Sequence, residues 1–210
     1  MNGPLKIVFE DADLLAVDKP RGILVEGDEH SLEVQVRDYA GVRSRALHRL
    51  DRDTTGVVLF AKNSKWNRAL AELFEKKRIR KEYWAIVRGS WNKSINKIDT
   101  CINRKDSGRW ENSKSEGKAA LTTFRVLGRT SDFSWVQALP KTGRTHQIRL
   151  HCLAAGCPIV GDRFYSDDKC NPLLLHAKSL SFPHPNGGGE LRMQSEASED
   201  WSEWLSVFEQ

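Results

Sequence analysis

The sequence lacks any long hydrophobic run. No stretch of its 210 residues approaches the roughly 18 consecutive apolar residues of a membrane-spanning helix, and the mean hydropathy is −0.54. The first residues, Met1 to Pro4, show no basic stretch followed by an apolar core, so no secretory signal is expected. We therefore expect no membrane partner.

Cysteine is also scarce. The four cysteines are Cys101, Cys152, Cys157 and Cys170. They contain no Cys-x-x-Cys pair and are too sparse for a disulfide framework, which favours a reduced, cytoplasmic compartment. An alternative is a zinc site formed by His146, His151, Cys152 and Cys157. Their spacing does not match the usual paired-ligand patterns, so we expect no metal.

Charge is distributed unevenly along the chain. The whole sequence carries a net charge of +5. Residues 190 to 210 hold six acids and one base, whereas the preceding 189 residues hold 32 bases and 22 acids. A basic body with an acidic tail suits a polyanionic partner, and nucleic acid is the commonest of these.

Periodicity predicts a single α+β domain spanning residues 1–210. Apolar or alternating runs predict strands at 6–10, 14–18, 57–61, 81–88, 119–128, 134–139 and 173–182. The residues predicted to cap the N-termini of helices are Ser31, Ser64, Thr145 and Ser198. Residues 91 to 116 predict a long polar excursion with weak β structure. The last helix, at about 198–209, is acidic and carries an apolar stripe that predicts packing.

Two segments contain most of the residues that could react with a substrate or bind a phosphate. His48 to Gly56 is a charged loop that runs directly into the apolar strand, so a carboxylate such as Asp51 would be held rigidly. Gly143 to His151 predicts a helix whose first N–H groups, with Arg144 and Thr145, suit a phosphate. The simpler alternatives are a solvated turn with surface ion pairs and a basic surface helix with two ordinary histidines.

A third basic segment follows the predicted helix that begins at Ser64. Five of the six residues from Lys76 to Lys81 are basic, which exceeds what a helix C-terminus needs. Either a phosphate contact or a solvated face fits this pattern.

Together these segments resemble the RluA-type pseudouridine synthases. The resemblance rests on ordered motifs between about residues 7 and 195, namely Val17–Gly22, His48–Asp51 with Thr54–Gly56, Lys81–Tyr83, Gly143–His151, Gly161–Tyr165 and Leu173–Ala177. Thr55 stands where serine is commoner in the family, and no segment resembles the family's frequent S4-like RNA-binding domain. The resemblance implies a pseudouridine synthase fold, with a mixed, largely antiparallel central sheet and flanking helices.

The resemblance also implies roles for individual residues in isomerising uridine of ribosomal RNA or tRNA by base flipping. Asp51 would be the nucleophile, Tyr83 would line the pocket and Arg149 would pair with Asp51. The implied substrate-binding residues are His48, Arg49, Arg144, Thr145 and Leu175, with Arg49 filling the gap left by the flipped nucleotide. A catalytically silent RNA-binding module of the same fold is the alternative, and a monomer suffices for either activity.

The chemistry explains why these residue types suit the reaction. A C-glycoside forms from an N-glycoside only if the bond to ribose breaks and the base rotates, and a carboxylate can stabilise the separated state covalently. Burial raises an aspartate pKa, while an adjacent arginine lowers it. Arg149 is therefore expected to keep Asp51 charged when water is excluded, and its planar fork does this better than lysine would.

Overall fold

The computed structural model describes residues 5–42, 44–105, 107–169 and 171–208. Met1–Pro4, on which the expectation about a signal rests, and Cys170 lie outside the described residues. The chain forms two compact units, and each draws on an early and a late stretch of sequence. The first unit comprises residues 1–81 and 177–197, and the second comprises 82–176 and 198–210. The assignment of all 210 residues to one catalytic domain stays a prediction.

The first unit is built on an antiparallel sheet. Its strands lie in the order β1 (Ile7–Glu10), β2 (Leu14–Lys19), β4 (Thr55–Ala61) and β10 (Leu175–Pro183), with β3 (Arg45–Ala46) paired to β4 and β11 (Glu190–Gln194) paired to β10. β1 and β2 form the predicted hairpin. Every residue of β4 is buried, which agrees with its β-branched, apolar sequence. The loop that precedes β4 therefore leads into the interior of the sheet.

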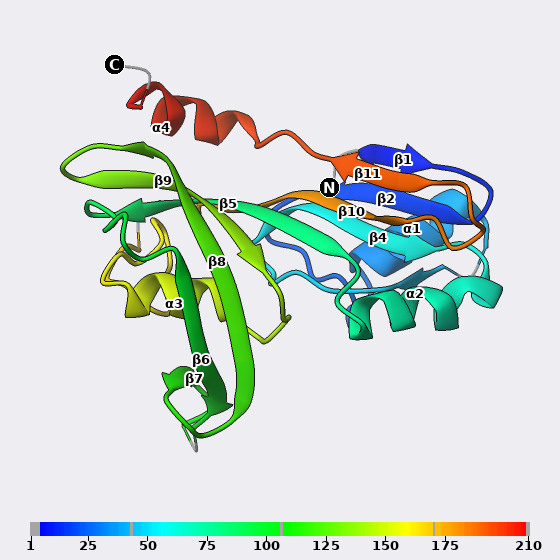
Figure 1. The fold of residues 1–210 in the computed structure, drawn as a ribbon. Helices are drawn as coiled ribbons and strands as arrows, with labels where there is room; N and C mark the ends of the chain where they lie inside the picture. The colour runs from blue at the N-terminus through cyan, green and yellow to red at the C-terminus, as the bar shows by residue number, and fades with distance from the viewer. Residues whose placement is uncertain (1–4, 43, 106, 170, 209–210) are drawn as a thin grey trace. The chain divides into compact units, whose positions relative to one another are not determined.

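Two helices accompany this sheet (Figure 1). α1 (Leu32–Ala40) begins directly after Ser31, as predicted, and buries Leu32 and Val36. The predicted cap at Ser64 is wrong, because Asn63 caps a short 3₁₀ turn there and its side chain accepts a hydrogen bond from the backbone N–H of Lys65. α2 (Asn67–Glu75) follows that turn, and its apolar residues pack on β2, β4 and β10.

The second unit contains a longer antiparallel sheet. Its strands lie in the order β5 (Arg80–Arg88), β9 (Phe133–Pro140), β8 (Lys118–Arg129), β6 (Lys97–Arg104) and β7 (Trp110–Ser113). Residues 91 to 116 contain more β structure than the weak β structure predicted for them, because β6 pairs with both β7 and β8. The polar composition concealed these strands, whose inward side chains are few. Figure 1 shows β6 and β8 as long neighbouring ribbons, with the short strand β7 beside β6.

α3 (Gln147–Ala154) begins one residue later than predicted. Its cap is His146, in the left-handed region at φ 57°, and not Thr145. Six consecutive residues, from Gln147 to Cys152, are buried, so the alternative of a basic surface helix is wrong. Gly156 follows the helix at φ +75°, as a C-terminal glycine should. The sequence missed the burial of α3 because its buried side chains include an arginine and a histidine.

The C-terminal part of the acidic tail, from Ser198 onwards, packs within the second unit. A 3₁₀ turn (Glu199–Trp201) leads into α4 (Ser202–Ser206). Trp201 is buried, and the rings of Trp204 and Phe208 contact those of Phe133 and Trp135. The predicted packing stripe is confirmed, and so is the α+β class with its largely antiparallel sheets.

Candidate active site

The backbone of the Asp51 loop is fixed by a buried lysine. Lys19 ends β2, is fully buried, and donates to three carbonyl oxygens, those of Pro20 at 2.9 Å, Ile23 at 2.9 Å and Arg52 at 2.8 Å. An ammonium group has three donors, so its capacity matches these acceptors. Lys19 thereby ties the turn after β2 to the residue that follows Asp51.

The electrostatics of Lys19 reflect its position. Burial lowers its pKa to about 8, and the negative charges of Asp53 and Asp51 partly oppose that shift. A buried cation is costly unless it is paired and hydrogen-bonded. The buried charge of Lys19 therefore interacts electrostatically with both carboxylates of the loop, Asp51 and Asp53.

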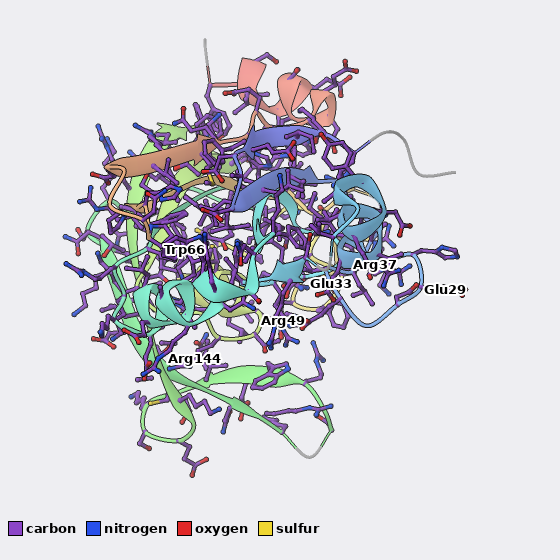
Figure 2. All side chains as sticks on the ribbon, turned by 90° about the vertical axis from the view of Figure 1, so that its right-hand side faces the viewer. Glu29, Glu33, Arg37, Arg49, Trp66 and Arg144 are labelled. Atoms are coloured by element: carbon purple, nitrogen blue, oxygen red, sulfur yellow. The ribbon has the colours of Figure 1, made fainter. Side chains whose placement is uncertain are left out.

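Further hydrogen bonds hold the same turn. The Gly22 N–H donates to the Arg52 carbonyl oxygen at 2.9 Å, and the Arg52 Nε donates to the Gly22 carbonyl oxygen at 2.8 Å. The Thr54 N–H donates to the Asp51 carbonyl oxygen at 3.1 Å. The side chain of Asp51 is half-buried and that of Arg49 is exposed (Figure 2). A rigid loop thus presents a carboxylate and a guanidinium two residues apart.

His48 braces the beginning of this loop. Its Nε2 accepts a hydrogen bond from the Leu59 N–H at 3.1 Å, and its ring lies 5.5 Å from that of Phe74. Burial, followed by the nearby charge of Lys81, lowers the His48 pKa to about 3. The imidazole is therefore neutral near neutral pH and offers no positive charge to a phosphate. Its contact with substrate stays a prediction.

Gly56 brings two sequence motifs together within the first unit. Its φ is +108°, and a Cβ there would lie 2.3 Å from the carbonyl oxygen of Ala177 on β10. Only glycine allows this backbone contact between β4 and β10. The motif ending in Gly56 and the motif ending in Ala177 therefore owe part of their composition to packing.

In the second unit, Arg149 is held by a buried carboxylate. Its Nε donates to Asp162 Oδ2 at 2.9 Å and its Nη2 donates to Asp162 Oδ1 at 2.6 Å. The two side chains are only 6% and 1% exposed. Asp162 Oδ1 also accepts the N–H groups of Phe164 and Tyr165. This bidentate pair fixes the plane of the guanidinium.

Aromatic rings surround the same guanidinium. Arg149 Cζ lies 5.1 Å from the ring centre of Phe164 and 5.2 Å from that of Tyr165, within cation–π distance. His146 contacts the Tyr165 hydroxyl through Nδ1 at 2.7 Å. The loop after Gly161 thus sets both the orientation and the surroundings of Arg149.

The residues predicted to hold a phosphate lie just before α3. Arg144 donates from Nε to the carbonyl oxygen of Ala119 at 3.0 Å, and its N–H donates to Gln147 Oε1 at 3.0 Å. Gln147 Oε1 also accepts from the Thr142 hydroxyl. Thr145 is half-buried in this turn. A phosphate contact at Arg144 and Thr145 stays a prediction.

Tyr83 and Leu175 belong to one apolar cluster. Leu175 is a buried member, Tyr83 packs against the cluster, and Ile148 brings α3 into it. The predicted site residues are therefore divided between the units. His48, Arg49 and Asp51 belong to the first, and the second contains Tyr83, Arg144, Thr145, Arg149 and Leu175.

The described residues give no support to a zinc site. Among them no group of three or more histidine, cysteine or acidic side chains is arranged to hold a metal ion. His151 contacts the hydroxyls of Thr122 and Thr100 through its two ring nitrogens, and burial lowers its pKa to about 4. Cys101, Cys152 and Cys157 are free thiols.

Comparisons with known proteins agree with these motifs. The family described as RNA pseudouridylate synthase matches residues 13–154. The chain belongs to this family. It is 33% identical, over 97% of its own length and 70% of the relative, to the ribosomal large subunit pseudouridine synthase C of Buchnera aphidicola. It is 38% identical to the D enzyme of Borreliella burgdorferi, of which it spans 61%.

A solved structure of the family shows the same fold. Human RNA pseudouridylate synthase domain containing 4 superposes with a TM-score of 0.82 at 26% identity, covering 97% of this chain and 93% of that one. Enzymes of the RNA pseudouridylate synthase family are isomerases, and the RluA-type resemblance of the sequence is confirmed. In the part of the chain that the structure describes, no helix is long and apolar enough to cross a membrane.

Two residues of the site escaped the sequence reasoning. Lys19 is predicted only as part of the motif Val17–Gly22, although its place between an apolar strand and a proline offers a signal of burial. Asp162 was quoted only within a motif, because nothing in its local sequence shows that it pairs with a residue 13 positions earlier.

Proposed function

We propose that this chain isomerises uridines of ribosomal RNA or tRNA to pseudouridine, with Asp51 as nucleophile. The observation that carries the proposal is the fixed loop at Asp51, whose backbone is held by Lys19 and by the bonds between Gly22 and Arg52. A pre-positioned carboxylate is what covalent catalysis by aspartate needs. The names of the bacterial relatives favour ribosomal RNA, and the scarcity of cysteine favours a cytoplasmic site of action.

The proposed reaction begins with extrusion of the target nucleotide. Unstacking a base costs a few kcal/mol, and we assign the vacated space in the RNA to the exposed side chain of Arg49. Arg144 and Thr145 contact the RNA backbone, and Leu175 packs beneath the uracil. His48 lies at the start of the loop and contributes by holding it. No cofactor, metal or second subunit is required.

The chemistry then proceeds at the glycosidic bond. The Asp51 carboxylate adds to the base or to the ribose, and the bond between ribose C1′ and uracil N1 breaks. The uracil rotates, a bond forms between C1′ and C5, the C5 proton leaves to solvent while N1 takes up a proton from solvent, and Asp51 is released. Arg149, already oriented by Asp162, keeps Asp51 ionised while water is excluded. Tyr83 stacks on the uracil or accepts the C5 proton.

The direct test uses a large-subunit ribosomal RNA transcript labelled with tritium at uridine carbon 5. The intact chain is expected to release tritium to water, and mapping of pseudouridines in cells with and without the gene product identifies the position. A catalytically silent RNA-binding module would bind this RNA, release no tritium and leave the modification map unchanged. That result would overturn the proposal.

A further inference from the structure

The most exposed aromatic ring beside the proposed catalytic residues belongs to Phe164. Phe164 is 58% exposed, although it lies only two residues after the buried Asp162 that holds Arg149. A single exposed apolar residue needs no special explanation. Phe164 differs from an ordinary surface residue because hydrogen bonds hold its backbone and the buried Arg149 guanidinium packs against its ring.

The backbone of Phe164 is anchored at both of its polar groups. Its N–H donates to Asp162 Oδ1 at 3.0 Å, and its carbonyl oxygen accepts from Arg109 Nη2. Asp162 is almost fully buried and is itself engaged by Arg149. The ring therefore projects from a rigid support, so presenting it to a ligand costs little conformational entropy.

The surroundings of the ring are cationic and aromatic. The Arg149 guanidinium carbon lies 5.1 Å from the Phe164 ring centre, and the His146 ring lies 5.6 Å away with a tilt of 53°. A planar, exposed π surface beside a positive charge suits an unstacked nucleobase, which offers its own π face while its phosphate seeks a cation.

We propose that Phe164 is a substrate-binding residue that stacks on the base of a nucleotide flanking the target uridine. This inference rests on the proposed function, in which Tyr83 and Leu175 hold the target uracil and Arg149 faces Asp51. Because Phe164 contacts the same guanidinium within the second unit, it is placed to meet a base that neighbours the target uracil. Every base has a π face, so the contact tolerates different sequences and contributes mainly to affinity.

The test compares Phe164→Leu and Phe164→Trp with the wild type. Leucine keeps apolar bulk without a π face, whereas tryptophan enlarges that face. Binding of a short fluorescent oligouridylate is expected to weaken by about 5- to 150-fold in Phe164→Leu, the range typical of one base–aromatic stack. Phe164→Trp is expected to bind at least as tightly as the wild type. Tyr39→Leu, which removes another aromatic ring that is 53% exposed, is the matched control and should change nothing.

Tritium release separates binding from positioning. In Phe164→Leu the KM for labelled large-subunit ribosomal RNA should rise by the same factor, while kcat stays within about twofold. A lower kcat at unchanged KM would show that Phe164 only positions Arg149, and unchanged binding and KM would leave it an ordinary surface residue or a protein contact. Equal losses in Tyr39→Leu would show that the effect is not specific to Phe164. Each of these results overturns the inference.

The two proposals fail in different ways. If the wild type releases no tritium but its oligouridylate affinity depends on Phe164 as expected, the proposed function falls and the stacking role stands. If tritium is released and the Phe164→Leu variant behaves as the wild type does, the stacking role alone falls.

Discussion

The Asp51 loop and the Arg149 region are rigid for opposite electrostatic reasons. In the first unit a buried cation, Lys19, donates to backbone carbonyl oxygens and holds a loop that bears a carboxylate. In the second unit a buried anion, Asp162, accepts from backbone N–H groups and holds a guanidinium. The loop of the proposed nucleophile Asp51 is thus held by a buried cation, and the guanidinium of Arg149 is held by a buried anion. We infer that the Asp51 loop and the Arg149 guanidinium are each held in position before RNA binds.

The largest effect on stability is expected from breaking the anionic support. Asp162→Ala leaves Arg149 buried without its partner, which should lower the free energy of unfolding by about 3–5 kcal/mol. The double variant Asp162→Ala/Arg149→Met removes both charges and should be more stable than Asp162→Ala alone. Urea unfolding of the set measures this, and additive losses in the double variant would contradict the role of the pair.

The buried cation Lys19 should contribute somewhat less to the free energy of unfolding than Asp162 does. Lys19→Met leaves three backbone carbonyl oxygens without their donor, at a cost of about 3 kcal/mol in the free energy of unfolding. Lys6→Met is the matched control, because Lys6 is 67% exposed and pairs with Asp18 at the surface. Its loss should stay below about 1 kcal/mol. Equal urea midpoints for the two variants would show that Lys19 does not hold the loop.

The comparison also explains what the sequence could predict. The strands from Leu14 to Lys19 and from Thr55 to Ala61 follow from local patterns, because one apolar run specifies one buried strand. The pairing of Asp162 with Arg149 and the burial of α3 depend on contacts between distant segments, which periodicity does not encode. For the same reason, the sequence predicts only weak β structure where the polar strands β6 and β7 form.

The buried histidines make stability depend on pH. His151 has a pKa of about 4 in the folded chain against about 6.5 when unfolded. The unfolded state therefore binds more protons as the pH falls below about 6.5. The His151 contribution should lower the free energy of unfolding by about 2 kcal/mol between about pH 7 and pH 5. His48, with a pKa of about 3, acts in the same direction.

The variant His151→Gln isolates this contribution. Its free energy of unfolding should start lower than that of the wild type near neutral pH, because contacts with Thr100 and Thr122 change. Between about pH 7 and pH 5 it should then fall by about 2 kcal/mol less than the wild type falls. Denaturant unfolding at both pH values measures the difference, and parallel losses would refute the assigned titration.

The smallest effect is expected outside both supports, at the exposed basic segment that follows α2. Lys77→Gln and Arg78→Gln should leave stability nearly unchanged, because both side chains are exposed. If they contact phosphates, each should lower the slope of log affinity against log salt by about 1. Arg37→Gln, on α1 (Figure 2), is an exposed control of equal charge change. An unchanged slope would assign the segment to a solvated face.

The most direct measurement of the central claim is tritium release by Asp51→Asn beside Asp53→Asn. Both substitutions remove one carboxylate from the same loop, and both carboxylates act on the charge of Lys19. We predict that Asp51→Asn folds and binds RNA as the wild type does but releases no tritium from labelled large-subunit ribosomal RNA, while Asp53→Asn retains activity. Release at the wild-type rate by Asp51→Asn would contradict the assignment of the nucleophile.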